Sequence, residues 1–128
     1  MSAAPEEIVR QRVLSLMIEE LAYPKGLIAV EKDLSSVSPA DRGRRVDILC
    51  FTPASGGVSP LLLIECKADL WDEAAEKQAL GYNEKIGAPF IALAGKEAIK
   101  TFWREKGRVA SVPFLPRFPD LLAAVHGR

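Results

Sequence analysis

Two acidic residues and a lysine occupy two neighbouring segments that both have the composition of β-strands. Asp47 lies in RVDILCF, and Glu65 and Lys67 lie in LLLIECKA. If the two segments pair as a hairpin with Asp47 opposite Glu65, the turn centres on Gly56, within the turn-forming sequence TPASGGVSP. Side chains alternate along a strand, so Glu65 and Lys67 share one face. The spacing therefore predicts that three ionisable side chains meet on one patch of sheet.

This combination of side chains indicates metal-dependent hydrolysis. Carboxylates at one site repel each other, and burial increases the cost, which a divalent cation removes. Mg²⁺ prefers oxygen ligands and keeps several waters, so Asp47, Glu65 and the main-chain carbonyl of Cys66 are the predicted ligands. Lys67 would then orient or deprotonate a metal-activated water, or stabilise the phosphate during attack. The alternative is a salt bridge between Lys67 and one acid on a partly solvated strand end.

The periodicity of apolar residues places these segments in a mixed α/β architecture. Expected helices cover 5–22, 69–87 (beginning at Asp69 or Asp72 and ending at Gly87), 96–107 and a short closing segment from Phe118. Expected strands cover 27–34, 45–51, 61–68 and 89–95, with a further edge strand in RVASVPFL. Three successive strands followed by a crossover helix and a fourth strand predict a mixed sheet flanked by helices.

The motifs RRVDILCF, LLLIECKAD and QALGY together resemble the PD-(D/E)xK nuclease superfamily. They resemble most the N-terminal nuclease domain of type I restriction enzyme R subunits, over roughly residues 5–95. The resemblance implies a restriction-endonuclease-like αβββαβ core and Mg²⁺-dependent hydrolysis of DNA that leaves 5′-phosphate ends, with Mn²⁺ as a substitute metal. R subunits continue into an ATP-driven translocase, but no G-x-x-x-x-G-K-[ST] motif is present here, so ATP dependence is not carried over.

The same resemblance assigns supporting residues outside the two strands. The Q-x-x-x-Y helix of the family corresponds to Gln78 and Tyr82, which share a helix face and would lie over the metal site. Gln78 would orient Lys67 or the water, and Tyr82 would contact a DNA phosphate; alternatively, they are a surface glutamine beside a packed tyrosine. Glu7 corresponds to the acid on the first helix, although a glutamate in a first turn is also favoured by the helix dipole alone. Glu31 competes for that role.

Composition restricts the function classes. The 128 residues fit one domain over 1–128, with 48% hydrophobic and 27% charged residues. Lys and Arg total 17 and so do Asp and Glu, so bulk charge predicts no nucleic-acid partner. We therefore expect weak DNA binding by the domain alone, helped by a homodimer or by a separate targeting or motor protein. A metal- or DNA-binding regulatory module that keeps the nuclease fold without cutting is the main alternative.

The remaining features have ordinary explanations as well as functional ones. The single histidine, His126, lies two residues from the end, which disfavours a Ser-His-Asp triad. The absence of a signal pattern or long apolar run predicts a cytoplasmic protein outside membranes. Cys50 and Cys66 are expected to be buried free thiols that face away from the acids. Trp71 is available for stacking on a base or for packing in the core. A basic loop could bind phosphate or simply be solvated; it contains Arg42, Arg44 and Arg45.

Overall fold

The computed structural model describes residues 5–33 and 45–126, without the side chains of 31–33 and 45. The basic loop arginines Arg42, Arg44 and Arg45 therefore lie outside the described side chains, as does the side chain of Glu31. The elements in chain order are α1 (Pro5–Glu19), a 3₁₀ turn (Lys25–Leu27), β1 (Ile28–Asp33), β2 (Arg45–Ala54), β3 (Gly57–Cys66), α2 (Glu73–Ile86), β4 (Phe90–Ala94), β5 (Ile99–Glu105), β6 (Arg108–Val112) and α3 (Phe118–His126).

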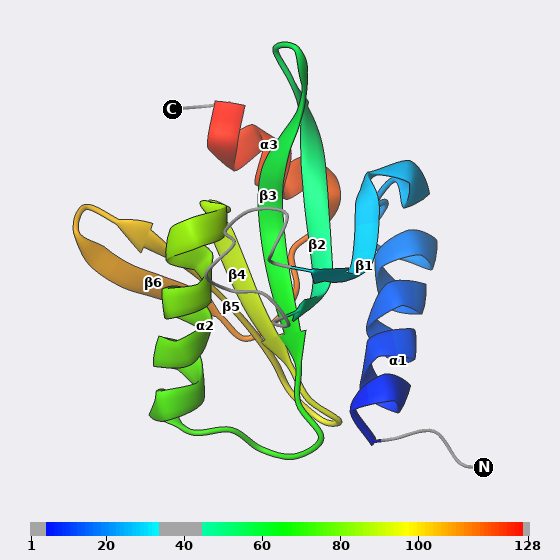
Figure 1. Cartoon of the computed structure of the whole chain (residues 1–128), viewed down its shortest axis with the longest axis vertical. Helices are drawn as coiled ribbons and strands as arrows, with labels where there is room; N and C mark the ends of the chain where they lie inside the picture. Colours follow the sequence, from blue (N-terminus) through cyan, green and yellow to red (C-terminus); the bar gives the residue numbers. More distant parts are fainter. Residues whose placement is uncertain (1–4, 34–44, 127–128) are drawn as a thin grey trace.

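One six-stranded mixed sheet forms the centre of the molecule, with its strands in the order β1-β2-β3-β4-β5-β6 (Figure 1). Every neighbouring pair is antiparallel except β3 and β4, which are parallel and joined by α2. A parallel pair requires a crossover connection, and α2 supplies it. The predicted mixed sheet and crossover helix are confirmed, and the architecture is restriction-endonuclease-like.

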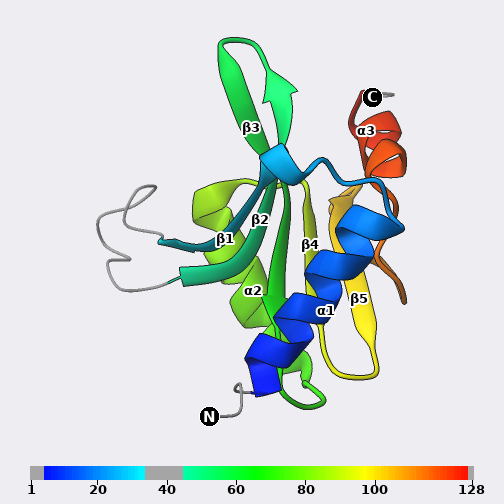
Figure 2. The same cartoon turned by 90° about the vertical axis from the view of Figure 1, so that its right-hand side faces the viewer.

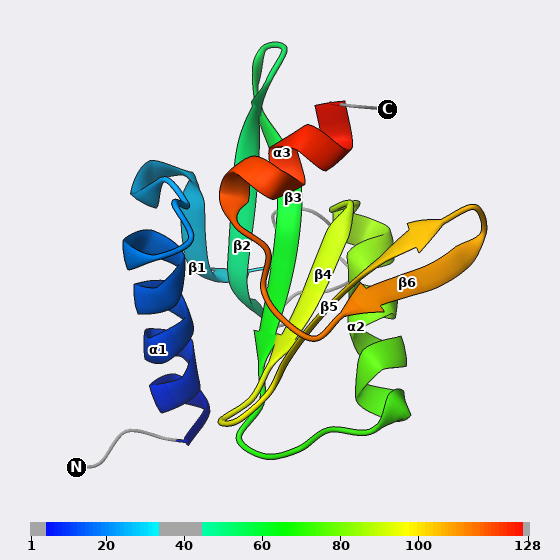
Figure 3. The same cartoon turned by 180° about the vertical axis from the view of Figure 1, so that it is seen from behind.

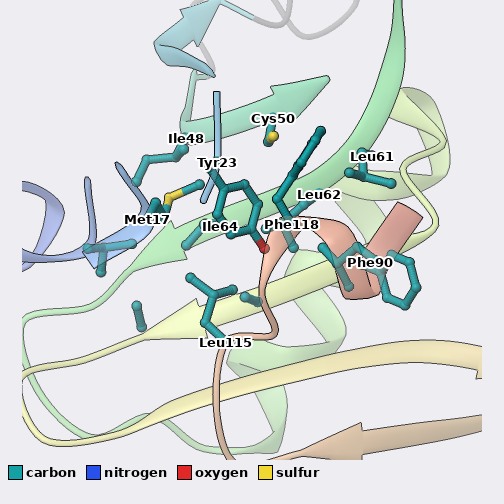
Figure 4. Close-up of a cluster of buried hydrophobic side chains, with 14 of the residues drawn as sticks. Met17, Tyr23, Ile48, Cys50, Leu61, Leu62, Ile64, Phe90, Leu115 and Phe118 are labelled. Carbon is teal, nitrogen blue, oxygen red and sulfur yellow. The ribbon is translucent and has the colours of Figure 1, made fainter. Parts of the chain in front are cut away.

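Helices cover both faces of the sheet, which makes three layers. Figure 2 shows α1 in front of the sheet and α2 behind it, and Figure 3 shows α3 lying across β2 and β3. The α1-side core joins α1, α3 and alternate strand residues; its members include Val13, Met17, Tyr23, Ile48, Cys50, Leu62, Ile64, Cys66, Ala92 and Phe118 (Figure 4). The α2-side core lies on the opposite face; its members include Leu49, Leu63, Ala79, Ile91, Leu93 and Phe102.

The predicted helix over 96–107 is wrong, because Ile99–Glu105 is the strand β5. Its side chains alternate between the two cores: Ile99 and Trp103 pack on the α1-side core, whereas Phe102 belongs to the α2-side core. Two buried faces at period two are the pattern of a central strand, and pairing with β4 and β6 satisfies its backbone. Lys106 and Gly107 form the turn between β5 and β6. Both have positive φ angles, 51° and 78°, as tight hairpin turns require.

The chain after β6 returns to the sheet and covers the α1-side core. Leu115, Phe118 and Leu121 are buried there, and the Tyr23 hydroxyl donates a 2.7 Å hydrogen bond to the carbonyl of Pro116. Tyr23 also packs against the Phe118 ring at a centroid distance of 5.4 Å. The expected edge strand and closing helix are both present, as β6 and α3.

None of the helices in the described part of the chain has the length and apolar character needed to cross a membrane.

Candidate active site

The β2–β3 hairpin has the register that the sequence predicts around Asp47 and Glu65. Ile48 pairs with Ile64, so Asp47 and Glu65 are the next residues outward on the two antiparallel strands. A β-bulge between Cys50 and Phe51 shifts the register by one residue toward the turn. The bulge lets β2 and β3 continue to a tight turn at Gly56 (φ 80°) without changing which residues are opposite at the far end.

The Asp47 carboxylate is held in place by the neighbouring strand. Its Oδ2 accepts a 2.7 Å hydrogen bond from the backbone N–H of Cys66. Burial raises the pKa of Asp47, and the charge of Glu6 adds to this, although the Cys66 N–H and the charges of Arg10 and Lys67 act in the opposite direction. A carboxylate in this setting is fixed in direction but incompletely neutralised by the protein.

Glu65 is more deeply buried, with 7% of its surface exposed. Burial is the largest cause that raises its pKa, the charge of Asp47 raises it further, and Lys67 opposes the shift. The Lys67 Nζ lies 3.6 Å from Glu65 Oε2. The structure thus brings Asp47, Glu65 and Lys67 together, with two partly desolvated carboxyl groups and one ammonium.

This donor set fits a small divalent cation. Mg²⁺ binds through one or two carboxylates and completes its shell with water and substrate oxygens. Asp47 and Glu65 provide two carboxylates whose mutual repulsion and desolvation a cation would relieve. Among the described residues, no group of three or more His, Cys, Asp or Glu side chains could enclose a metal ion. The predicted third ligand, the carbonyl of Cys66, remains a prediction.

On α1, the glutamate whose charge acts on the two acids is Glu6. Its charge raises the pKa of both Asp47 and Glu65. Glu7 instead forms an ion pair with Arg10 and accepts a 2.9 Å hydrogen bond from Gln11, and these contacts lower its pKa. The role predicted for Glu7 remains a prediction.

Helix periodicity places Glu6, which is exposed, on the side of α1 that carries the buried residues. The buried residues of α1 are Val9, Val13 and Met17, and Glu6 precedes them by three, seven and eleven residues, so it shares their face. Glu7 is displaced from that face. The helical spacing of the apolar residues was therefore the sequence signal that pointed to Glu6.

Gln78 and Tyr82 lie on α2 and contact each other. The Gln78 amide donates a 3.1 Å hydrogen bond to the Tyr82 hydroxyl, so its partner is Tyr82 rather than Lys67. Both residues are on the helix that covers the same face as Leu63, two residues before Glu65. Their predicted roles at the metal and at a DNA phosphate remain predictions.

The two cysteines belong to the opposite face. Cys50 and Cys66 are buried free thiols of the α1-side core, as expected, and Cys50 pairs with Leu62, four residues from Cys66. Burial raises the pKa of each thiol to about 12, so both are protonated at neutral pH. A protonated thiol is a poor metal ligand.

Three further residues, which the sequence did not bring together, lie beside the segment that follows Lys67. The Trp71 indole N–H donates to Glu76, and Lys100 forms an ion pair with the same carboxylate at 3.0 Å. The helix expected over 96–107 included Lys100, which lies on β5 instead, so this contact was not predicted. The β-branched and aromatic residues Ile99, Thr101, Phe102 and Trp103 are typical of a strand and were the available signal.

Comparison with known proteins places this geometry in a family. Residues 5–119 match the family described as the type I restriction enzyme R protein N terminus. A comparison with curated protein sequences gives no match.

Two solved structures share the fold. One is a fragment assigned as the HsdR subunit of a type I restriction enzyme from Vibrio vulnificus, with TM-score 0.58 and 18% identity over 98% of this chain and 27% of that one. The other is a DUF820 protein from Anabaena variabilis assigned as a nuclease, with TM-score 0.54 and 14% identity over 97% of this chain and 77% of that one. This chain thus spans about a quarter of the HsdR fragment. With the family matching most of its length, the chain belongs to the N-terminal domains of type I restriction enzyme R proteins.

Proposed function

We propose that this domain hydrolyses phosphodiester bonds of DNA in a reaction that depends on Mg²⁺, with Mn²⁺ as a substitute. The observation that carries the proposal is the meeting of Asp47, Glu65 and Lys67, with the pKa of both carboxyl groups raised by burial. Desolvated, like-charged carboxyl groups destabilise a fold, so their presence together at one site points to a function. Family membership supports a nuclease-like role.

Each of the three side chains has a distinct task in this proposal. Asp47 and Glu65 would hold the cation, and the N–H of Cys66 would keep the Asp47 carboxylate oriented. When bound, the cation would supply Lewis-acid stabilisation of the phosphate and a lowered pKa for water. Lys67 carries three N–H donors and would orient the attacking water and stabilise negative charge on the phosphate oxygens.

The reaction would be a single displacement at phosphorus. A bond forms between the water oxygen and phosphorus, and the bond from phosphorus to the 3′ oxygen breaks. The water loses a proton, and the 3′ oxygen takes one up from solvent. The products are a 5′-phosphate and a 3′-hydroxyl, with Gln78 orienting Lys67 or the water and Tyr82 contacting a DNA phosphate.

A second candidate function is a metal- or DNA-binding regulatory module that keeps the fold without cutting alone. The formal net charge of zero favours it, because phosphate contacts by Lys and Arg supply most non-specific DNA affinity. Under the nuclease proposal, a second copy of the chain or a separate motor protein would help to hold the DNA.

One assay separates the two functions. Purified protein is incubated with supercoiled and linear DNA in Mg²⁺, Mn²⁺ or chelator, in parallel with Asp47→Ala and Lys67→Ala. Asp69→Ala and Lys96→Ala are the matched controls, because both residues are exposed. We expect metal-dependent nicking by the wild type and both controls, reduced at least about 100-fold in the two site variants.

DNA that survives every metal and salt condition would overturn the nuclease proposal. Calorimetry with Mn²⁺ then identifies what remains. Mn²⁺ binding by the wild type that disappears in Asp47→Ala would indicate a metal-binding module. If the wild type binds no Mn²⁺, the acids and Lys67 form only a salt bridge.

A further inference from the structure

A short segment leaves β3 directly after Lys67 and leads to α2, and Trp71 packs it against the sheet. The Trp71 ring lies so close to Gly95 that a Cβ built there would be 3.0 Å from Trp71 Cζ3 and 3.5 Å from the carbonyl oxygen of Asp69. A side chain at position 95 would therefore displace the ring or the backbone. The segment is seated on the end of β4 by direct contact between ring and backbone.

A polar network fixes the other side of the same ring. The indole N–H donates a 3.2 Å hydrogen bond to Glu76 Oε2, and Lys100 Nζ lies 3.0 and 3.2 Å from the two oxygens of Glu76. Glu76 is in the first turn of α2, and Lys100 is on β5. Trp71, Glu76 and Lys100, which we call the loop clamp, thus connect the segment to a helix and to a strand.

The loop clamp stands in register with the candidate active site. Leu93 on β4 pairs with Glu65 on one side and with Lys100 on the other, so the three residues form one row across neighbouring strands. Two strand spacings separate the backbones of Glu65 and Lys100 by roughly 10 Å. The N–H of Lys67 donates a 2.8 Å hydrogen bond to the carbonyl of Ala94. Ala94 directly precedes Gly95, against which the Trp71 ring packs.

Stability alone does not require this arrangement. The side chains of Lys100 and Glu76 are 38% and 25% exposed, and ion pairs near the surface add little to the stability of a fold. The start of α2 is already capped, because Asp72 accepts a 3.1 Å hydrogen bond from the N–H of Ala75. What the network adds is a fixed path for the chain between Lys67 and the helix.

We propose that Trp71, Glu76 and Lys100 are positioning residues that hold the segment after β3 and thereby keep the Lys67 amine beside Glu65. The inference rests on the proposed nuclease function for its catalytic consequence. An amine displaced by about 1 Å loses much of its effect on the attacking water and the phosphate, so loosening the loop clamp lowers turnover rather than DNA binding.

The first test measures turnover in three variants that each remove one part of the loop clamp. Trp71→Phe keeps the ring and deletes the N–H, Glu76→Gln removes the charge, and Lys100→Met removes the ammonium. Glu73→Gln and Lys96→Met are matched controls, since Glu73 shares the first turn of α2 and both residues are exposed. We expect kcat to fall about 10-fold in the three variants, with KM for DNA and Tm close to the wild-type values, and to stay unchanged in the controls.

Repeating the variants in a Lys67→Ala background shows whether the effect passes through Lys67. We expect no further loss of kcat there, because the group that the loop clamp positions is already missing. An equal loss in both backgrounds would overturn the inference, as it would show a general structural role. Wild-type kcat in all three single variants would overturn it as well.

A second readout does not depend on cleavage. Lysine Cε signals in NMR spectra, with Lys67 assigned by substitution, report the surroundings of its amine. We expect the Lys67 signal to shift in Glu76→Gln and to stay in place in Glu73→Gln. If the wild type does not cut DNA but this shift occurs, the nuclease proposal fails and the positioning role stands. A Lys67 signal that is unmoved in all three variants overturns the positioning role whether or not the protein cuts.

Discussion

The backbone N–H of Cys66 donates to the carboxylate of Asp47, so the strand that carries Glu65 and Lys67 also orients the acid on its neighbour. Residues 65 to 67 therefore contribute to the site in two ways. Their side chains at alternate positions face the α2 side, and the backbone between them fixes the third group. The geometry depends on hairpin register, because a slip by one residue would turn the side chains to the other face.

Removing the negative charges of the site is expected to stabilise the fold. Burial raises the pKa of both Asp47 and Glu65, which means that their charged forms are less favourable in the folded protein. We expect Asp47→Asn to raise Tm by roughly 2–4 °C at pH 7.5 without metal, about 0.5–1 kcal/mol for a chain of this size. Thermal denaturation measures this, and an Asp69→Asn variant serves as the exposed control. A Tm lowered by Asp47→Asn would mean that the carboxylate is compensated within the fold.

The same shifts predict how stability changes with pH. A carboxyl group with a raised pKa binds its proton more tightly in the folded state, so its contribution makes the unfolding free energy rise as pH falls through the folded pKa. This contribution is complete below the unfolded values, near 4. We expect the stability of the wild type to approach that of the double variant Asp47→Asn/Glu65→Gln as the pH is lowered from 7.5 to 4.

Urea denaturation across that range measures the difference between the two proteins. Using the difference removes the contribution of other carboxyl groups such as Glu7, whose pKa is lowered and whose effect has the opposite sign. A gap that stays constant or widens toward pH 4 would contradict the raised pKa values.

The hairpin and its acids could be predicted because local signals and long-range pairing agreed. Turn residues around Gly56 and apolar runs on both sides allow few registers, and one of them places Asp47 opposite Glu65. The structure adds the bulge at Cys50, which the sequence does not reveal. Predicted roles for Gln78, Tyr82 and Glu7 came from family resemblance, and the hydrogen bonds of Gln78 and Glu7 are with neighbours on their own helices.

The strand β5 was wrongly predicted as a helix because its charged residues suggested a solvated helix face. Lys100 pairs with Glu76 on α2, and the hydroxyl of the buried Thr101 donates to the carbonyl of Phe114. Both partners are distant in sequence. Local secondary-structure propensity is overridden where polar groups obtain their hydrogen-bond partners through tertiary contacts.

Replacing Gln78, at the outer edge of the site, is expected to affect DNA nicking but not stability. Its side chain is exposed and hydrogen bonded to Tyr82, so Gln78→Ala should change Tm by no more than about 2 °C. Under the proposed function, we expect the rate of DNA nicking to fall about 10-fold, since a group that orients Lys67 or the water is lost. Lys77→Ala, at the adjacent exposed position of α2, is the control. Nicking at the wild-type rate in Gln78→Ala would show that Gln78 does not orient Lys67 or the water.

The most direct measurement is a crystal structure of the protein grown with Mn²⁺, with data collected at the manganese absorption edge. We predict one anomalous peak within about 2.5 Å of carboxylate oxygens from both Asp47 and Glu65, with the Lys67 amine beside it and no peak in crystals of Asp47→Asn/Glu65→Gln. Manganese bound elsewhere with neither acid as a ligand, or the Lys67 amine filling the space between the two carboxylates in the presence of metal, would contradict the account.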